Sequence, residues 1–200
     1  MKLLVFTDIH GDLSTLEKLK KEVREKHIEL IICTGDYTFF ENHIEYLTKR
    51  IAELGAEVLI IHGNHEYDDV MRVLCKKYKH MHFLHNKIKK IGNYTFIGHG
   101  GGGFSLKDPE FVEAMKSLTK DLDKKEKIVL ITHAPAHGTK LDMVPGYGHV
   151  GNKDYRRFIE TNNVVLALSG HIHESFGKED KIGKARVINP GYKGKVVTLE

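Results

Sequence analysis

The sequence predicts an α/β protein in which buried, largely parallel strands are covered by helices. Short apolar runs alternate with amphipathic segments through the first half of the chain, which is the βαβαβα order of a parallel sheet. The apolar runs are continuous, which indicates strands buried on both faces. The second half mixes hairpin-like strands with helices, so mixed pairing is expected there. No linker or repeat divides the chain, and we expect one domain over residues 1–200.

The first half contains three strand–helix pairs. Strands are expected at residues 2–7, 30–34 and 57–61, and helices from residue 14 and over residues 41–54 and 67–77. Ser14 and Glu17 have the spacing of a capping box, which predicts that Ser14 opens the first helix. Asp12, just before it, is expected to cap the helix or to pack in the loop. Gly55 is placed to end the second helix.

The rhythm of the elements changes after residue 80. Strands are expected at residues 82–84, 94–98, 128–132, 164–169, 186–189 and 195–199, with a further candidate at 87–91. Helices are expected over residues 109–122, where Pro109 suits a first helical position, and over residues 154–161. The closely spaced strands of this half favour antiparallel neighbours beside the parallel ones.

Composition and charge narrow the class of protein. The chain has 200 residues, 40% of them hydrophobic, which suits one compact domain with a sizeable core. Lys and Arg number 31 against 27 Asp and Glu, for a net charge of +4. This mild excess suits an anionic substrate and permits a nucleic-acid partner without specifically indicating one. The oligomeric state stays open.

The cysteines and the apolar runs bear on the compartment. Cys33 lies in an apolar run, where it is typical of a small core residue. The N-terminal residues lead directly into an expected strand, and no apolar stretch approaches the roughly 20 residues that a membrane span needs. We therefore expect a reduced, cytoplasmic protein without a membrane partner.

Side chains of metal-binding types follow five of the expected strands. The chain has 14 histidines, and histidine is the commonest metal-binding side chain. The carboxyl ends of parallel strands share one edge of a sheet, so side chains that follow them are expected to converge. Each segment alone would be a cap, a turn or a core histidine, but five together favour a metal site. The segments are Asp8-Ile9-His10, Gly35-Asp36, Gly63-Asn64-His65-Glu66, His133, and Gly170-His171-Ile172-His173.

Local geometry supports the same interpretation. Extended residues at positions i and i+2 share a face, so Asp8 and His10 are expected to point the same way, as are His171 and His173. Gly35, Gly63 and Gly170 stand directly before candidate ligands, where the chain must turn without a side chain in the way. Glu66 is placed either to orient His65 or to lie at a helix N-terminus.

The order of these segments resembles the calcineurin-like metallophosphoesterases. The similarity spans residues 8 to 173, and the part from His133 through Gly148-His149-Val150-Gly151 to His173 looks most like small class III phosphodiesterases. The resemblance implies a four-layer αββα sandwich of two mixed β-sheets flanked by helices, with the metals at their C-terminal edge. It further implies a dinuclear centre that hydrolyses phosphate esters.

The resemblance also assigns roles to the candidate residues. One metal would be held by Asp8, His10 and His173, the other by Asn64, His133 and His171, and Asp36 would bridge them. His65 would be the catalytic residue that faces the scissile phosphate, either as a general acid or as a stabiliser of charge. Two divalent ions clamp a phosphate and lower the pKa of a shared water, which supplies hydroxide for attack. Manganese is the expected metal, and Fe, Zn, Co or Ni also suit these ligands.

Departures from the family pattern narrow the substrate class. Protein phosphatases of this superfamily carry an Arg just before the Gly-Asn-His segment, where this chain has Ile61 and His62. They also carry an acidic residue at the position of Phe39. Purple acid phosphatases place a metal-bound tyrosine there, and Tyr37 is displaced from that position. Neither activity is therefore expected.

A metal-dependent phosphodiesterase acting on a small or nucleotide-like substrate is the leading hypothesis. His99, His149 and Asn152 are candidate substrate contacts, since each lies in a glycine-rich or polar loop. A phosphomonoesterase or a nuclease on the same site is the alternative enzyme. A non-enzymatic scaffold of the same fold is disfavoured because His65 and all seven ligand candidates are present.

Overall fold

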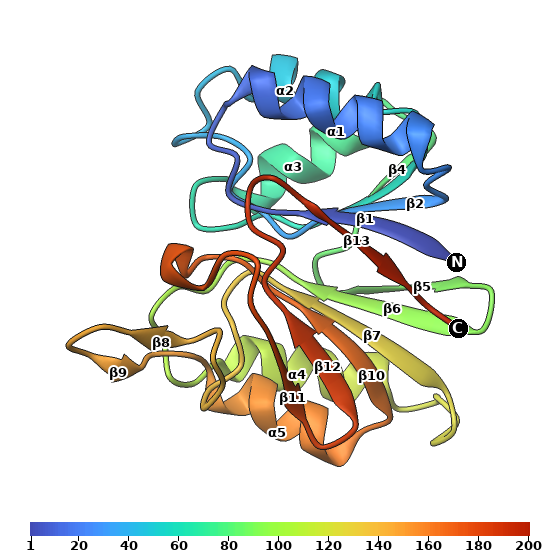
Figure 1. Ribbon diagram of the computed structural model, residues 1–200. Coiled ribbons are helices and arrows are strands. Elements are labelled where there is room, and N and C mark those ends of the chain that lie inside the picture. Colours follow the sequence, from blue (N-terminus) through green and yellow to red (C-terminus); the bar gives the residue numbers. More distant parts are fainter.

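The computed structural model describes residues 1–200 as two β-sheets packed face to face, with helices outside each sheet (Figure 1). The first sheet has the order β13-β1-β2-β3-β4, where β1 is Lys2–Phe6, β2 Leu30–Cys33, β3 Glu57–Ile60, β4 Met81–Phe83 and β13 Lys195–Thr198. The second has the order β11-β12-β10-β7-β6-β5, where β5 is Lys87–Ile91, β6 Tyr94–His99, β7 Lys127–Thr132, β10 Val164–Leu168, β11 Glu179–Ile182 and β12 Ala185–Ile188.

Five α-helices form the two outer layers. Figure 1 shows the first three over the outer face of the first sheet and the last two over the outer face of the second. They are α1 (Leu13–Glu25), α2 (Ile44–Ala52), α3 (Asp68–Cys75), α4 (Pro109–Leu118) and α5 (Lys153–Thr161). This four-layer arrangement of two mixed sheets confirms the predicted fold class.

Parallel pairing dominates the centre of both sheets. β1, β2, β3 and β4 pair in parallel, and β13 is antiparallel to β1. In the second sheet β6, β7, β10 and β12 are parallel, while β5 and β11 are antiparallel edge strands. The parallel strands of both sheets therefore end on the same side of the molecule, which is on the left in Figure 1.

The continuous apolar strands arise because each sheet is covered on both faces. In β1, Leu3 and Val5 belong to the core between the sheets, where Val129 and Ile131 of β7 also lie. Leu4 and Phe6 belong to the core beneath the helices of the first sheet. Because successive strand residues point to opposite faces, both sets have to be apolar.

The structure corrects several element boundaries. Asp12, and not Ser14, caps α1: its carboxylate accepts hydrogen bonds from the backbone N–H groups of Ser14 and Thr15, at 2.9 and 3.3 Å. The ionised carboxylate satisfies two free N–H groups of the first turn, so the predicted capping box does not form. The helices expected over residues 41–54, 67–77 and 109–122 are shorter than predicted, and the candidate strand at 87–91 is β5.

Several short elements were absent from the prediction. β11 is the charged sequence EDKI, which lacks an apolar pattern, and it forms by pairing with β12. β8 (Met143–Val144) and β9 (Gly148–His149) make a small hairpin beyond the sheet edge, and η1 is the 3₁₀ turn His173–Ser175. None of the helices combines the length and the apolar character needed to cross a membrane.

Candidate metal centre

The candidate ligands meet where the two sheets present the carboxyl ends of their strands. Asp8, Asp36 and Asn64 follow β1, β2 and β3 of the first sheet, while His133 and His171 follow β7 and β10 of the second. Three groups of side chains place their ligand atoms within 4.8 Å of one another. The groups are Asp8 with His10 and His173; Asp36 with His133 and His171; and His10 with Asp36 and His65.

The first group is centred on the Asp8 carboxylate. Its Oδ1 lies 3.4 Å from Nε2 of His173 and 3.9 Å from Nε2 of His10. The two Nε2 atoms are 3.5 Å apart. The Nδ1 atom of His10 lies 3.1 Å from the carbonyl oxygen of Thr38, which turns Nε2 toward Asp8. All three ligand atoms therefore face the same point.

The second group is centred on Asp36. Its Oδ2 lies 3.3 Å from Nε2 of His133, and the same nitrogen is 3.0 Å from Oδ1 of Asn64. Nδ1 of His133 lies 2.8 Å from the carbonyl oxygen of Thr34, which fixes this ring in the same way as that of His10. The ring of His171 lies 5.1 Å from that of His133. Asp36 also belongs to the third group, which suits a residue shared between two ions.

Two buried ligand atoms of this centre have no hydrogen-bond partner. They are Oδ1 of Asp8 and Nε2 of His171. An unpaired buried polar atom costs free energy, and native proteins rarely leave one without a reason. One atom in each of the first two groups thus lacks a partner that a divalent cation would supply. Carboxylate oxygens and imidazole nitrogens are suitable donors for such an ion, so the residues present fit it.

The charges within the centre reinforce one another. Burial alone would raise the pKa of Asp36, but hydrogen bonding and charge from His133 outweigh it and bring the pKa to about 2. Burial would lower the pKa of His133, yet its bond to Asp36 raises it to about 9. His171 has no such partner, and its burial together with the nearby His133 lowers its pKa to about 4. In the metal-free centre, anionic carboxylates therefore lie next to both a charged and a neutral imidazole.

The backbone that carries the ligands is left-handed, contrary to the extended geometry predicted for Asp8-Ile9-His10 and His171-Ile172-His173. The φ angles of Asp8, His10, Asp36 and His171 are +51°, +44°, +51° and +66°. The chain turns immediately after each strand, so the shared direction of the side chains comes from the turn and not from a continued strand. Residues other than glycine are uncommon in this region of φ, and such conformations concentrate at functional sites.

The glycines before the ligands have the predicted purpose. A Cβ atom on Gly63 would collide with the carboxylate of Asp36, and one on Gly170 would collide with Thr7 and the carboxylate of Asp8. Only glycine leaves the carboxylates room at these two positions.

Glu66 links two of the loops that carry candidate ligands. Its carboxylate accepts hydrogen bonds from the backbone N–H groups of Asp36, Thr38 and Gly63, at 3.0, 2.9 and 2.9 Å. Burial and the nearby Asp36 charge raise its pKa to about 7. Glu66 thus ties the loop after β2 to the loop after β3. The sequence offered two other roles for it, because its partners are distant backbone groups that no local pattern reveals.

The three candidate substrate contacts lie outside the converging groups. His99 is buried, with Nδ1 at 2.7 Å from Asn86 and Nε2 at 3.0 Å from Asp108. Asn152 is buried and caps α5, and its amide nitrogen donates to the carbonyl oxygen of Ser105. His149 in β9 pairs with Asp142 at 2.8 Å. The polar atoms of His99 and Asn152 are thus engaged within the protein.

Exposed aromatic rings surround the centre, and no sequence pattern marked them. The Phe39 ring lies 5.3 Å from His65 and 6.2 Å from His10, and the Phe40 ring lies 4.2 Å from His65. On the other side, Phe104 lies 4.7 Å from His171. The residue preferences of strands and helices do not distinguish such rings from core residues, so only the fold identifies them.

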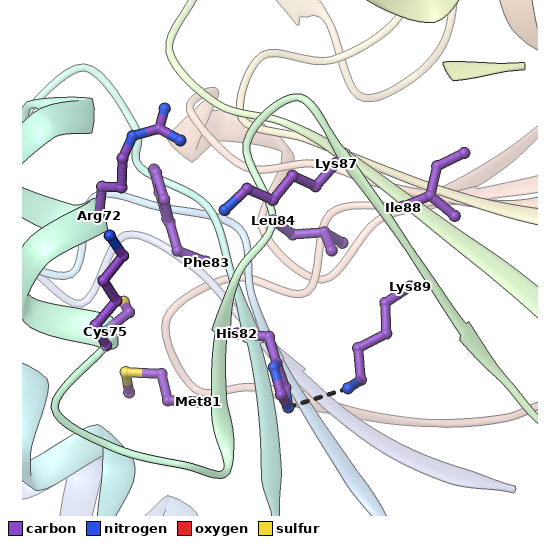
Figure 2. A pocket seen from close by; sticks show the side chains of 10 residues that line it. Arg72, Cys75, Met81, His82, Phe83, Leu84, Lys87, Ile88 and Lys89 are labelled. Carbon is purple, nitrogen blue, oxygen red and sulfur yellow. Dashed lines mark hydrogen bonds between the residues drawn. The ribbon is translucent and has the colours of Figure 1, made fainter.

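Another pocket, of about 360 Å³, lies between α3 and the edge strands β4 and β5 (Figure 2). Lys89 points to His82 at 3.1 Å and also pairs with Glu57 at 3.0 Å. Arg72 pairs with Asp68 at 2.6 Å. None of the candidate ligands lines this pocket. The charges of Lys89 and Arg72 are neutralised by Glu57 and Asp68.

Comparisons with known proteins agree with this fold. Residues 1–175 match the family model described as calcineurin-like phosphoesterase, whereas no curated protein matches the sequence. One crystal structure is 21% identical with a TM-score of 0.81, covering 95% of this chain and 90% of the other. TT1561 of Thermus thermophilus is 18% identical with a TM-score of 0.78, covering 95% and 88%. A dimetal phosphatase from Danio rerio is 10% identical with a TM-score of 0.59, covering 94% and 86%.

Proposed function

The chain belongs to the calcineurin-like phosphoesterase family, and on that premise we propose that it is a metal-dependent phosphodiesterase for a small or nucleotide-like substrate. The single observation that carries the proposal is the pair of buried ligand atoms that lack a hydrogen-bond partner, Asp8 Oδ1 and His171 Nε2. One belongs to each of the two groups that would hold an ion. The bridging role that the family resemblance gives to Asp36 is compatible with its place in two groups.

Two divalent cations bound here would clamp the phosphate and provide a water nucleophile at neutral pH. Asp8, His10 and His173 would hold one ion, and Asn64, His133 and His171 the other. Asp8 and Asp36 together contribute two negative charges, so the loaded site keeps a net positive charge that attracts a phosphate. We expect Mn²⁺, and Fe, Zn, Co or Ni would suit the same nitrogen and oxygen donors.

The hydrogen bond that His65 accepts favours one tautomer of its neutral ring. The backbone N–H of Phe40 donates to Nδ1 of His65 at 3.2 Å. Because Nδ1 accepts this bond, neutral His65 carries its proton on Nε2. Nε2 lies 3.8 Å from Oδ2 of Asp36, on the side of the candidate ligands. This arrangement supports His65 as a neutral hydrogen-bond donor to the developing charge on the leaving oxygen, in preference to an imidazolium acid.

The experiment is hydrolysis of bis-p-nitrophenyl phosphate, with and without added Mn²⁺. We expect metal-dependent turnover that exceeds the turnover of p-nitrophenyl phosphate. The His65→Asn variant should lose about 10²–10³-fold in kcat, the typical effect of removing one donor to a developing oxyanion, and keep its metal content. Tyr147→Ala is the matched control, since Tyr147 is 82% exposed in the turn between β8 and β9.

Other outcomes assign other functions. Faster turnover of the monoester would make the protein a phosphomonoesterase, and cleavage of DNA or RNA would make it a nuclease. A folded protein without turnover in any divalent metal would overturn the hydrolase proposal and favour a scaffold.

A further inference from the structure

A pocket of about 350 Å³ opens directly beside the candidate metal centre. It lies between the start of α1, the loop before α2 and the first turns of α2. His10 is common to both sites, because it lines the pocket and also places its Nε2 atom 3.5 Å from that of His173. The pocket is therefore close enough to the centre for one substrate to place its phosphate at the centre and an attached group in the pocket. The pocket is lined by His10, Gly11, Leu13, Phe39, Asn42, His43, Tyr46 and Leu47.

The walls of this pocket are large apolar side chains that the fold leaves exposed. Phe39 is 57% exposed, Tyr46 48% and Leu13 43%, while the neighbouring Leu47 is buried. Exposed apolar side chains that gather at one hollow mark a binding site more often than single ones do. Two of the three are aromatic, and aromatic faces stack on flat rings.

Free polar groups lie in the same lining. The side chains of Asn42 and His43 make no hydrogen bond within the protein, so both have donors and acceptors available. A heteroaromatic ring has flat apolar faces and polar atoms at its edge. It would therefore match both the apolar walls and the polar groups of this pocket. An aliphatic group would use the walls alone, and the exposed Asn42 and His43 would stay bonded to water. The volume is sufficient for a small ligand group.

The loop that forms this pocket is tied to His65. Phe40, Glu41 and His43 have φ angles of +49°, +59° and +55°, and such left-handed residues persist only where other contacts hold them. Those contacts run to the candidate catalytic residue: Phe40 N–H donates to His65 Nδ1, and Glu41 N–H donates to the His65 carbonyl at 3.1 Å. The pocket therefore has a fixed position on the His65 side of the centre.

We infer that this pocket binds a nucleobase carried by the substrate's ester group on the His65 side, stacked on Phe39 and Tyr46. The inference rests on the proposed function, because it places the phosphate of the same substrate at the metal centre. It narrows the substrate class to nucleotides and assigns Phe39 and Tyr46 as specificity-determining residues.

The test compares AMP with ribose 5-phosphate, which share the sugar phosphate and differ by the base. Dissociation constants are measured by calorimetry on Mn²⁺-loaded protein that carries His65→Asn to slow turnover. We expect AMP to bind about tenfold more tightly than ribose 5-phosphate. Phe39→Ala and Tyr46→Ala, each added to that background, should weaken AMP binding about five- to tenfold, in keeping with the energy of one base–aromatic stack. Neither change should alter the binding of ribose 5-phosphate.

Tyr147→Ala in the same background is the control, and it should leave both dissociation constants unchanged. Equal affinity of the starting protein for the two ligands would overturn the inference. Loss of the AMP preference in Phe104→Ala but not in Phe39→Ala would also overturn it, because the base would then lie beside His171. If the protein hydrolyses bis-p-nitrophenyl phosphate but binds AMP no more tightly than ribose 5-phosphate, only the nucleobase pocket is contradicted. An AMP preference without hydrolysis supports the subsite and sinks only the hydrolase proposal.

Discussion

The histidines near the strand ends form two neighbouring clusters that differ in their charge partners. The carboxylate cluster has Asp8 and Asp36 at its centre, with ligand atoms of His10, His133, His171 and His173 around them. The histidine core consists of His62, His85 and His99. Its rings follow one another at 4.6 and 5.1 Å, and all three residues are buried.

The histidine core also has one buried atom without a hydrogen-bond partner, Nδ1 of His62, but its rings pack mainly on one another. Burial and the neighbouring His85 lower the pKa of His62 to about 3, and burial also lowers that of His85. His85 accepts the N–H of Gly100 at 2.9 Å, and His99 is held between Asn86 and Asp108. Asp108 lies at one end of this core, and the solvent-accessible Glu110 and Asp68 lie 3.4 and 3.9 Å from Nε2 of His85. The buried Asp36, by contrast, lies within reach of several imidazoles at once. The comparison teaches that the number of histidines does not mark a candidate metal site, whereas their convergence on a buried carboxylate does.

The largest expected difference between the clusters comes from neutralising one carboxylate in each. Asp36→Asn should remove metal and lower kcat/KM by at least about a hundredfold, because even outer partners of a metal site matter by 10–100-fold. Asp108→Asn should keep the metal content of the wild type. Metal per chain, measured by elemental analysis beside diester hydrolysis, checks both. Equal metal content in the two variants would contradict the division into clusters.

Metal removal should separate the clusters by stability. A ligand that binds only the folded state at 100 to 1,000 times its Kd adds about 3–4 kcal/mol, so chelation should lower Tm by the corresponding amount. The effect should vanish in Asp36→Asn and persist in Asp108→Asn. Thermal unfolding with EDTA, and again after Mn²⁺ is restored, measures it. A wild-type Tm that is unchanged by EDTA would argue against a metal bound at this centre.

Acid should reveal the charge at the end of the histidine core. Burial would raise the pKa of Asp108, but hydrogen bonds from His99, the Phe111 N–H and Tyr155 lower it to about 2 from the ordinary 3.8. The unfolded chain therefore binds the proton more readily, and stability falls as the pH falls. The Asp108 charge contributes about 2 kcal/mol to the free energy of unfolding. This contribution is fully present above roughly pH 4 and is lost as the pH falls through about 2.

Asp108→Asn isolates this charge because asparagine also caps helices, and Asp108 caps α4. The difference in unfolding free energy between wild type and variant should shrink by about 2 kcal/mol between pH 5 and pH 2. Denaturant unfolding of the metal-free proteins at both pH values measures the change. A constant difference would show that the Asp108 charge contributes nothing.

The smallest expected effect concerns one hydroxyl of the same region. Tyr155 donates to Asp108 at 2.8 Å, so Tyr155→Phe should cost about 1 kcal/mol of unfolding free energy. Metal content and diester hydrolysis should match the wild type. A loss of metal in this variant would mean that the two clusters are coupled.

Local and repeated signals were sufficient for most of the strands and helices, whereas the four-layer sandwich was implied by the family resemblance. The apolar run of residues 2–7 and its counterparts carry the periodicity of buried strands, and β1 and β7 lie where the runs predict. The convergence of Asp8, Asp36 and His133 followed from strand ends that share an edge. Their roles as ligands stay a prediction.

The rest depended on contacts between distant residues. Glu66 accepts the N–H of Asp36, 30 residues away, and His65 accepts the N–H of Phe40, 25 residues away. The left-handed turns at Asp8 and Asp36 accompany such contacts. β11 lacks an apolar pattern because pairing with β12 forms it. No short-range rule contains such information. The Asp12 cap is a different case, because its partners are two and three residues away and a local capping preference could have chosen it over Ser14.

The left-handed turns imply a trade-off between the proposed activity and the stability of the fold. Glycine is the residue that most readily adopts the φ values of Asp8, His10, Asp36 and His171, and other residues there cost stability. Each of the four positions carries a candidate ligand. A duplicate of this gene freed from selection for catalysis would drift toward glycine at these positions. Its product would gain backbone stability and lose the candidate ligands, so an unusually stable relative with glycines there would lack the proposed activity.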